Sequence, residues 1–267
     1  MIAFGKHLVL NFLFGMREKT LLLMNYLFPI VFYLFIGGIM PQINGGSTET
    51  LIPAMIIFSV IVSTLLGMPN DIVNSRNDGV YRNYKINGIS KISTLLVPAI
   101  STAVHSFIVS CIIFFTAPIL FDVKSEYSLI SLLIVFLCVY ITCSGVALVI
   151  GSISDNTSVT VVLAQIIFLP SMLIGGLMIP TSQLPKSLIK FSELLPTTYA
   201  MDLLESLNNL NPAKYSTILS IVILLSVGLI GYIVANYLFR FDVTDKSKKK
   251  ITAILVLLPF VINILFL

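Results

Sequence analysis

Residues that could act as acids, bases or metal ligands are few in this chain of 267 residues, and their spacing forms no catalytic motif. The 2 histidines are His7 and His105, and the 3 cysteines, at positions 111, 138 and 143, have no spacing typical of zinc ligands. No H-E-x-x-H, G-x-S-x-G or G-x-x-x-x-G-K-S/T sequence occurs. We therefore expect no catalytic residue, no metal site and no cofactor bound by this chain, and we do not predict an enzyme.

His105 lies inside a long apolar run, close to Ser101 and Ser106. A histidine within a membrane span is a functional candidate by default, so it could centre an intramembrane enzyme. It has no carboxylate nearby in the sequence and could equally stay neutral and bond a neighbouring helix. The sequence leaves the role of His105 open.

Six long apolar runs surround these residues, and none of them contains Asp, Glu, Lys or Arg. A helix that crosses a hydrocarbon core of about 30 Å needs about 20 apolar residues, and a charge at its centre costs about 2.5–3.5 kcal/mol. With 57% hydrophobic and 10% charged residues, the composition excludes an ordinary soluble domain. We predict an all-α membrane protein with six transmembrane helices, spans one to six, over Leu21–Met40, Leu51–Met68, Leu95–Leu120, Leu129–Ile150, Ser158–Ile179 and Tyr215–Phe239.

The 16 Lys and Arg residues are divided unequally between the two sides of these spans. The segments before span one, between spans two and three, and after span six hold 12 of them, and the opposite side holds 4. Cytoplasmic segments carry the excess of Lys and Arg. We therefore predict a multi-pass cell-membrane protein whose N-terminus lies in the cytoplasm. Because topology places these cations, we expect no nucleic-acid partner.

Both ends of the chain carry further apolar segments. Phe4, Leu8, Phe12 and Met16 recur every four residues, which predicts a helix lying along the cytoplasmic interface with this face in lipid. The run Ile251–Leu267 follows the basic sequence SKKK and is apolar all round, which favours insertion. It is at the short limit for a span, so a seventh transmembrane helix is expected but its complete crossing is left open.

Two connecting segments have patterns of their own. In Pro69–Thr94, on the cytoplasmic side, Asn70 or Asp71 could cap a short helix that ends near Gly79. In Pro180–Lys214, on the outer side, apolar residues at helical spacing follow Pro185 and again Pro196. Because proline is tolerated in the first turn of a helix, this pattern predicts two short outer helices.

The segment Gly175–Leu204, with the sequence GGLMIPTSQLPKSLIKFSELLPTTYAMDLL, carries Gly, Pro, Tyr and Asp residues in a distinctive order. In this order the sequence resembles the type-2 ABC transporter permeases, the membrane subunits of ATP-driven exporters, and reads closer to their drug-export branch. The resemblance covers residues 1–241, the permease domain, and leaves 242–267 as a basic linker plus an extra hydrophobic segment. It implies an outer gate or loop motif formed by Gly175, Gly176, Pro180, Pro185, Pro196, Tyr199 and Asp202.

The segment Pro69–Thr94 is similar to the part of these permeases that couples to the ATPase. Arg76 and Gly79 fit that pattern, whereas Gly88 stands where proline is common. In span five, Gln165 and Ser171 are candidate path-lining residues, or they could form interhelical hydrogen bonds. The resemblance implies an ATPase-coupling segment with Asp71, Arg76, Asp78, Gly79, Tyr81 and Arg82.

The resemblance also implies a complex in the lipid bilayer. Two copies of an ABC ATPase, which bind ATP and Mg, would join this chain and a second permease copy, identical or related. The charge-free spans suggest export of an amphipathic cargo such as a drug, an antimicrobial peptide or a lipid. The alternatives are a polysaccharide, teichoic-acid or haem exporter of the same architecture, an ATP-independent scaffold or immunity protein, and an intramembrane enzyme centred on His105.

Overall fold

The structure is a computed structural model and describes residues 2–43, 50–123, 127–208, 214–245 and 250–266. This part of the chain is helical and contains no strand, which confirms the all-α prediction. Within it, six helical stretches are long and apolar enough to cross a membrane, and they match the six predicted spans: Lys19–Ile39, Leu51–Asn77, Lys91–Phe121, Leu129–Ile153, Thr157–Ile174 and Thr217–Leu238.

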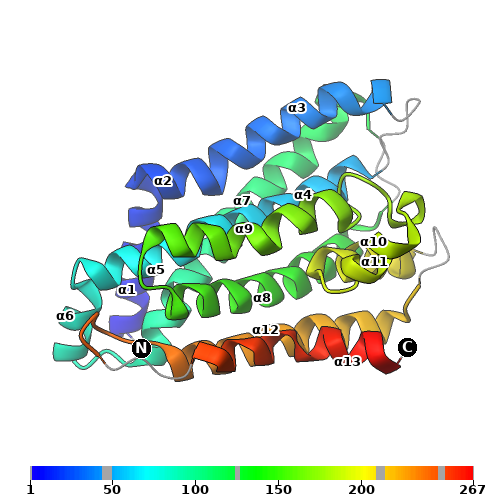
Figure 1. The fold of residues 1–267 in the computed structure, drawn as a ribbon. Coiled ribbons are helices and arrows are strands. Elements are labelled where there is room, and N and C mark those ends of the chain that lie inside the picture. Colours follow the sequence, from blue (N-terminus) through cyan, green and yellow to red (C-terminus); the bar gives the residue numbers. More distant parts are fainter. Residues whose placement is uncertain (1, 44–49, 124–126, 209–213, 246–249, 267) are drawn as a thin grey trace.

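Span two is the most deeply buried element. It consists of α4 (Leu51–Ile61), a π-helical stretch η2 (Val62–Gly67) and α5 (Met68–Asn77), and 94% of its most apolar window is buried. The helix α8 (Leu129–Ile153) lies beside it and is also mostly buried. The helices α4 and α8 are apolar all round, as expected of helices surrounded by other helices (Figure 1).

The closest helix packing joins α8 to α12 (Thr217–Leu238). A Cβ atom added to Gly145 of α8 would lie 3.0 Å from the Cα atom of Gly228 in α12, and one added to Gly231 would lie 2.7 Å from the carbonyl carbon of Gly145. Thr142 also donates its hydroxyl to the carbonyl oxygen of Leu224 at 2.7 Å. Small residues of this kind let two helix backbones meet where lipid supplies no hydrophobic driving force.

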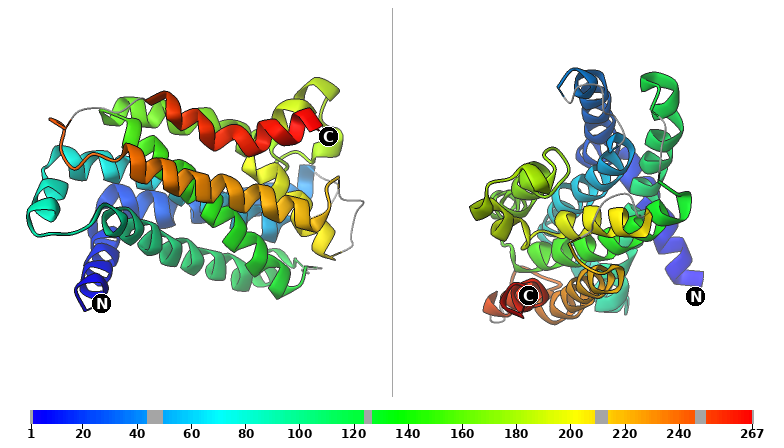
Figure 2. Two further views of the ribbon diagram at one scale, coloured as in Figure 1. Left: turned by 90° about the horizontal axis from the view of Figure 1, so that it is seen from below. Right: turned by 90° about the vertical axis from the view of Figure 1, so that its right-hand side faces the viewer.

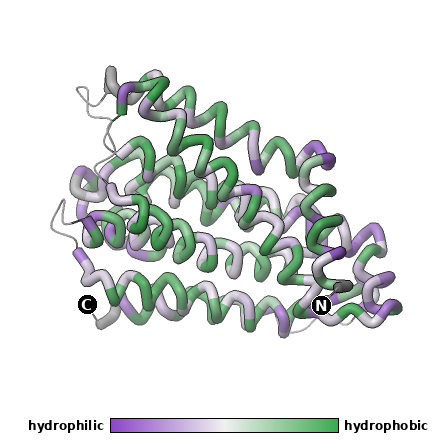
Figure 3. Tube along the Cα trace, turned by 180° about the vertical axis from the view of Figure 1, so that it is seen from behind, coloured by the Kyte–Doolittle hydropathy of each residue, from purple (hydrophilic) through white to green (hydrophobic). Residues whose placement is uncertain are grey.

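The outer layer is formed by span one, by α7 (Lys91–Phe121) and by α9 (Thr157–Ile174). Span one consists of α2 (Lys19–Leu22), the π-helical η1 (Leu23–Leu27) and α3 (Phe28–Ile43). These helices expose apolar side chains such as Phe35, Phe115 and Ile166, as surfaces that face lipid do. Figure 3 shows the apolar stretches along the helices and the polar residues toward both ends of the bundle.

The bundle has two distinguishable ends. The helix α6 (Val80–Ile86) lies at one of them, which we call the α6 end, and α10 (Lys186–Ser192) and α11 (Pro196–Asn208) lie at the other, the α11 end (Figure 1). The two short helices predicted between spans five and six are thus confirmed. Span five ends at Ile174 rather than Ile179, because Gly176 takes a left-handed φ of 88° and turns the chain.

The N-terminal helix α1 (Ile2–Arg17) runs across the long helices near the α6 end (Figure 2). The prediction of one lipid-facing stripe on it is wrong in detail. Phe12 stacks on His105 of α7, with ring centroids 4.3 Å apart, whereas Phe4 and Met16 are exposed. At about 100° per residue, Phe12 lies between Phe4 and Met16 around the helix axis, so the stripe is interrupted because α7 packs against its middle.

The C-terminal segment, as we call Lys250–Phe266, is helical and runs back beside α12 (Figure 2). It begins with the 3₁₀-helix η4 (Lys250–Leu257) and continues as α13 (Leu258–Phe266). A 3₁₀-helix rises about 2.0 Å per residue against about 1.5 Å in an α-helix, so the segment is about 30 Å long. That length equals the thickness of a hydrocarbon core. Residues 246–249, in the predicted basic linker, and Leu267 lie outside the described residues.

Candidate functional site

The first candidate region is the hairpin formed by α5 and α6, which extends beyond α1 at the α6 end (Figure 1). The short separate helix predicted after Asn70 or Asp71 is wrong, because span two continues without a break to Asn77. Gly79 then adopts a left-handed φ of 75° and turns the chain into α6. Gly88 has the same φ, and the amide of the next residue, Ile89, bonds the carbonyl of Tyr84 at 2.9 Å, which closes α6 with a Schellman motif.

Arg76 points into the protein and not toward solvent. Its side chain is buried, and the guanidinium donates to the carbonyl oxygens of Gly151, at 3.3 Å, and of Ser154. These carbonyls belong to the last turn of α8 and its C-cap, where a helix leaves acceptors without an internal partner. Arg76 therefore fixes α5 to the end of α8.

The other residues predicted for the coupling segment divide by exposure. Asp78 and Arg82 are exposed, and Asp71 and Gly79 are partly buried. Tyr81, a residue of α6, is buried. Burial raises the pKa of the Tyr81 phenol well above its usual value. The sequence analysis did not single out Ile86, whose side chain is 75% exposed on α6. The exposed side chains of the hairpin thus include Asp78, Arg82 and Ile86, whereas Arg76 is buried.

The chain that follows α12 contacts α6. Arg82 forms an ion pair with Asp242, and Lys85 lies 3.7 Å from Asp245. The ion pair with Arg82 holds the pKa of Asp242 well below its usual range. The ring of Phe239 also packs 5.3 Å from that of Tyr81. The hairpin is therefore connected to the end of α12 as well as to α8.

Asp155, in the turn between α8 and α9, connects these elements to the C-terminal segment. One of its carboxylate oxygens accepts from Arg240 at 2.7 Å and the other accepts from Lys250. Hydrogen bonds from these two cations lower the pKa of Asp155. Because the Asp155 side chain is 59% exposed, these two contacts add little to the stability of the fold. They fix the position of Lys250 relative to Arg240 at the end of α12.

The second candidate region is the α11 end. Gly175 lies where the start of α11 meets the end of α9, and a Cβ atom there would collide with the hydroxyl of Thr197. That hydroxyl donates to the carbonyl oxygen of Ser171 at 3.0 Å. Gly176 makes the following turn, with Met201 against it. The two glycines therefore have separate functions, a close approach at Gly175 and a left-handed turn at Gly176.

Tyr199 and Asp202 hold α11 to its neighbours. The buried Tyr199 donates its hydroxyl to the carbonyl oxygen of Glu193 at 2.8 Å and stacks on Tyr215 with centroids 5.2 Å apart. Asp202 accepts from the backbone amides of Lys214, at 2.6 Å, and Tyr215, at 3.1 Å. Burial raises the pKa of Asp202 in spite of these bonds.

The three prolines predicted for this motif occupy different surroundings. Pro196 is buried at the first position of α11, whereas Pro185 is exposed and immediately precedes α10. Pro180 is also exposed, in the turn that follows Gly176. Pro185 and Pro196 therefore mark the starts of the two outer helices, as the sequence predicted.

The two candidate path-lining residues lie in unlike places on α9. Ser171 is fully buried, at the junction with α11. Gln165 is partly buried, and its side-chain oxygen is enclosed without a hydrogen-bond partner in the described part of the chain. The hydroxyl oxygen of Ser171 is likewise enclosed without a hydrogen-bond partner among the described residues, so both side chains hold a buried polar atom that is unpaired there.

His105 is a packing residue between three elements. Its Nδ1 atom is 2.7 Å from the hydroxyl of Tyr26 in span one, its ring stacks on Phe12, and Gly15 of α1 leaves room for it. Among the described residues, no group of three His, Cys, Asp or Glu side chains is placed to hold a metal. These contacts match the expectation of a histidine that bonds a neighbouring helix.

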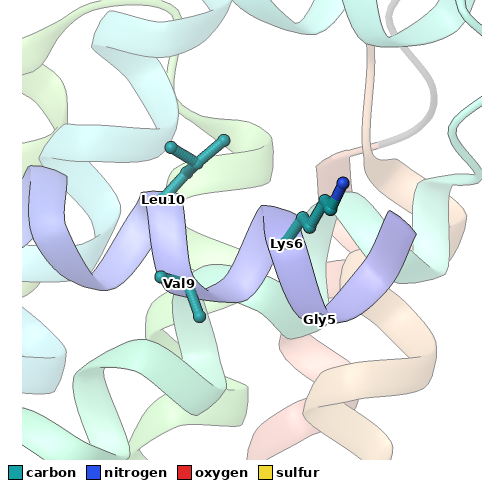
Figure 4. Close-up of a pocket in the computed structure, with 4 residues that line it drawn as sticks. All are labelled: Gly5, Lys6, Val9 and Leu10. Atoms are coloured by element: carbon teal, nitrogen blue, oxygen red, sulfur yellow. The ribbon is translucent and has the colours of Figure 1, made fainter. Parts of the chain in front are cut away.

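A shallow hollow beside α1 has a volume of about 430 Å³ and is lined by Gly5, Lys6, Val9 and Leu10 (Figure 4). All four residues come from one helix, and Lys6 supplies the single charge. Sites for small ligands have several polar groups that converge. The hollow does not have that character.

Comparison with known families agrees with this geometry. Residues 41–238 match the family described as ABC-2 family transporter protein, so the chain belongs to that family. Its members are transmembrane subunits of ABC transporters, and this chain is accordingly a multi-pass transport subunit rather than an enzyme. Searches of curated proteins and of solved structures returned no match. The match ends at Leu238, so the C-terminal segment lies outside it.

Proposed function

We propose that this chain is the permease subunit of an ATP-driven exporter whose ATP and Mg are bound by a separate ABC ATPase. The observation that carries the proposal is the α5–α6 hairpin, which extends beyond the bundle and is bonded to α8 through Arg76. A rigid helix end fixed in this way can transmit a displacement to packed spans. On this proposal the α6 end faces the cytoplasm of the cell membrane and carries the ATPase.

The docking surface of the hairpin is proposed to centre on Ile86. Its apolar side chain is 75% exposed on a helix that otherwise presents polar residues such as Arg82 and Asn83. Single exposed apolar residues are common on protein surfaces, so the proposal rests on the place of Ile86 in the helix α6 of the projecting hairpin and not on its exposure alone. Asp78, at the turn before α6, adds an exposed charge to the hairpin.

The test is purification of the tagged protein in a mild detergent, with identification of co-purifying proteins by mass spectrometry. We expect an ATPase with a Walker motif in a 1:1 ratio to this chain, as two copies of each would give. We expect Ile86→Glu to remove the ATPase while the protein keeps its membrane level. Val243→Glu is the matched control, because Val243 is also more than half exposed but lies after α12 and not on α6. Absence of an ATPase from the intact protein would contradict the proposal.

The cargo is proposed to be amphipathic, such as a drug, an antimicrobial peptide or a lipid. In support, the six predicted apolar runs contain no Asp, Glu, Lys or Arg, and Gln165 and Ser171 of α9 each hold a side-chain oxygen without a hydrogen-bond partner among the described residues. The test is ATP hydrolysis by the complex in proteoliposomes with a cationic amphipathic peptide, a phospholipid or a soluble oligosaccharide. Stimulation by the oligosaccharide alone would favour a polysaccharide exporter. Two permease copies per complex are expected from its mass.

A further inference from the structure

The C-terminal segment connects the two ends of the bundle. At the α6 end, Lys250 contacts Asp155, which also binds Arg240 at the end of α12. At the α11 end, Phe260 and Asn263 reach Tyr199 of α11. Its length of about 30 Å matches the distance that such a connection across a bilayer requires.

The contact with Tyr199 is buried and has two parts. The rings of Phe260 and Tyr199 are stacked, with centroids 5.4 Å apart and an interplanar angle of 22°. The amide nitrogen of Asn263 donates to the hydroxyl oxygen of Tyr199 at 2.9 Å. The three side chains are exposed by 5% or less.

Asn263 is the one amide in the apolar sequence ITAILVLLPFVINILFL. A polar group in an apolar span needs a partner, because hydrocarbon offers it no hydrogen bond. A slip of the C-terminal segment by one residue would turn Asn263 away from Tyr199. The hydrogen bond therefore sets the register of the segment against α11, as a single polar residue does in other helix pairs.

Tyr199 in turn connects several elements of the α11 end. Its hydroxyl donates to the carbonyl of Glu193, just after α10, and its ring stacks on Tyr215, just before α12. Whatever holds Tyr199 therefore holds the two outer helices and the start of span six together.

We propose that Asn263 is a positioning residue that restrains α11, and that the C-terminal segment is a transmembrane brace for the α11 end. If the chain exports cargo as proposed above, cargo leaves at this end, and opening there requires Tyr199 to separate from Asn263 and Phe260. The restraint itself does not depend on that function.

The test is hydrogen–deuterium exchange of the full-length protein in lipid nanodiscs, read by mass spectrometry. Asn263→Leu keeps the branched outline of the side chain and removes the donor. We expect amide exchange in residues 196–208 to accelerate by about 3- to 20-fold, the range for one interhelical hydrogen bond in a membrane, with residues 129–153 unchanged. Ile262→Leu is the matched control, because Ile262 is half exposed on the same helix.

Tyr199→Phe removes the acceptor without altering the C-terminal segment, and it also removes the bond from the Tyr199 hydroxyl to Glu193, so it should accelerate exchange at least as much as Asn263→Leu. The double variant should exchange no faster than Tyr199→Phe, because the bond to Asn263 is already absent from Tyr199→Phe. Unchanged exchange in 196–208, equal acceleration in 129–153, or additive effects would each overturn the proposal. The measurement uses neither ATPase nor cargo, so its result is independent of the purification test above.

Discussion

The guanidinium of Arg76 donates to the carbonyl oxygen of Gly151 across 75 positions of sequence, at 3.3 Å. This bond, with the one to Ser154, caps the end of α8 by a side chain from α5. It connects the hairpin proposed to bind the ATPase with the helix that α12 packs against most closely. A movement of the hairpin would therefore reach the centre of the bundle directly.

Replacement of Arg76 by Met is expected to destabilise the fold by about 1.5–3 kcal/mol, the usual contribution of hydrogen bonds from a charged group. Arg82→Met is the matched comparison, because Arg82 is 59% exposed in its ion pair with Asp242 and exposed pairs contribute about 0–1 kcal/mol. The measurement is thermal unfolding of the solubilised protein, monitored by size-exclusion chromatography. Equal losses from the two variants would show that the contact between Arg76 and α8 is not structural.

Gly145→Ala is expected to cost about 1–3 kcal/mol, the usual penalty for overpacking. The new Cβ atom would lie 3.0 Å from the Cα atom of Gly228, and neither backbone can yield without separating α8 from α12. Gly38→Ala is the control, since a Cβ atom there meets nothing within 4 Å, and a gain of about 0.5–1 kcal/mol is expected in a helix. The measurement is thermal unfolding of the two variants. A Gly145→Ala protein with unchanged stability would show that α8 and α12 do not cross so closely at Gly145.

Asp202 is expected to make stability fall as pH rises through its raised pKa. Burial raises the pKa of this carboxyl, so the folded state holds the proton to a higher pH than the unfolded state, whose pKa is about 3.9. The contribution of Asp202 to the free energy of unfolding is fully present below the pKa of the unfolded state. It is lost as pH rises through the pKa of the folded state. The melting temperature of the protein relative to Asp202→Asn should therefore decrease between pH 4 and neutrality. A difference that increases with pH would contradict the burial of this group.

Much of the fold is predictable because the bilayer constrains sequence strongly. A span without charge, such as Leu129–Ile150, can be recognised from length and composition alone, and the structure places α8 over the same residues. The stripe on α1 was mispredicted because the local repeat does not show that α7, distant in sequence, packs against Phe12. The short helix after Asn70 was mispredicted because local capping residues were weighed without the helix that precedes them.

The site was less predictable, because its contacts join residues that are distant in sequence. Nothing local distinguishes the buried Arg76 from the exposed Arg82, and their different surroundings come from α8 and from the chain after α12. Asn263 could have been noticed as a lone amide in an apolar run. Its partner Tyr199, which stands 64 positions earlier, could not.

The C-terminal segment is expected to place the end of the chain on the side opposite α6. Single cysteines would be introduced at the exposed residues Asn83 of α6 and Lys186 of α10 and, separately, after Leu267, with the three native cysteines replaced by alanine. A membrane-impermeant maleimide should label Lys186→Cys and the added C-terminal cysteine in intact cells. It should label Asn83→Cys only after the cells are permeabilised. A C-terminal cysteine that behaves like Asn83→Cys would show that the segment does not cross the membrane. Because Asn263 could not then lie beside Tyr199 at the α11 end, that result would also remove the proposed brace.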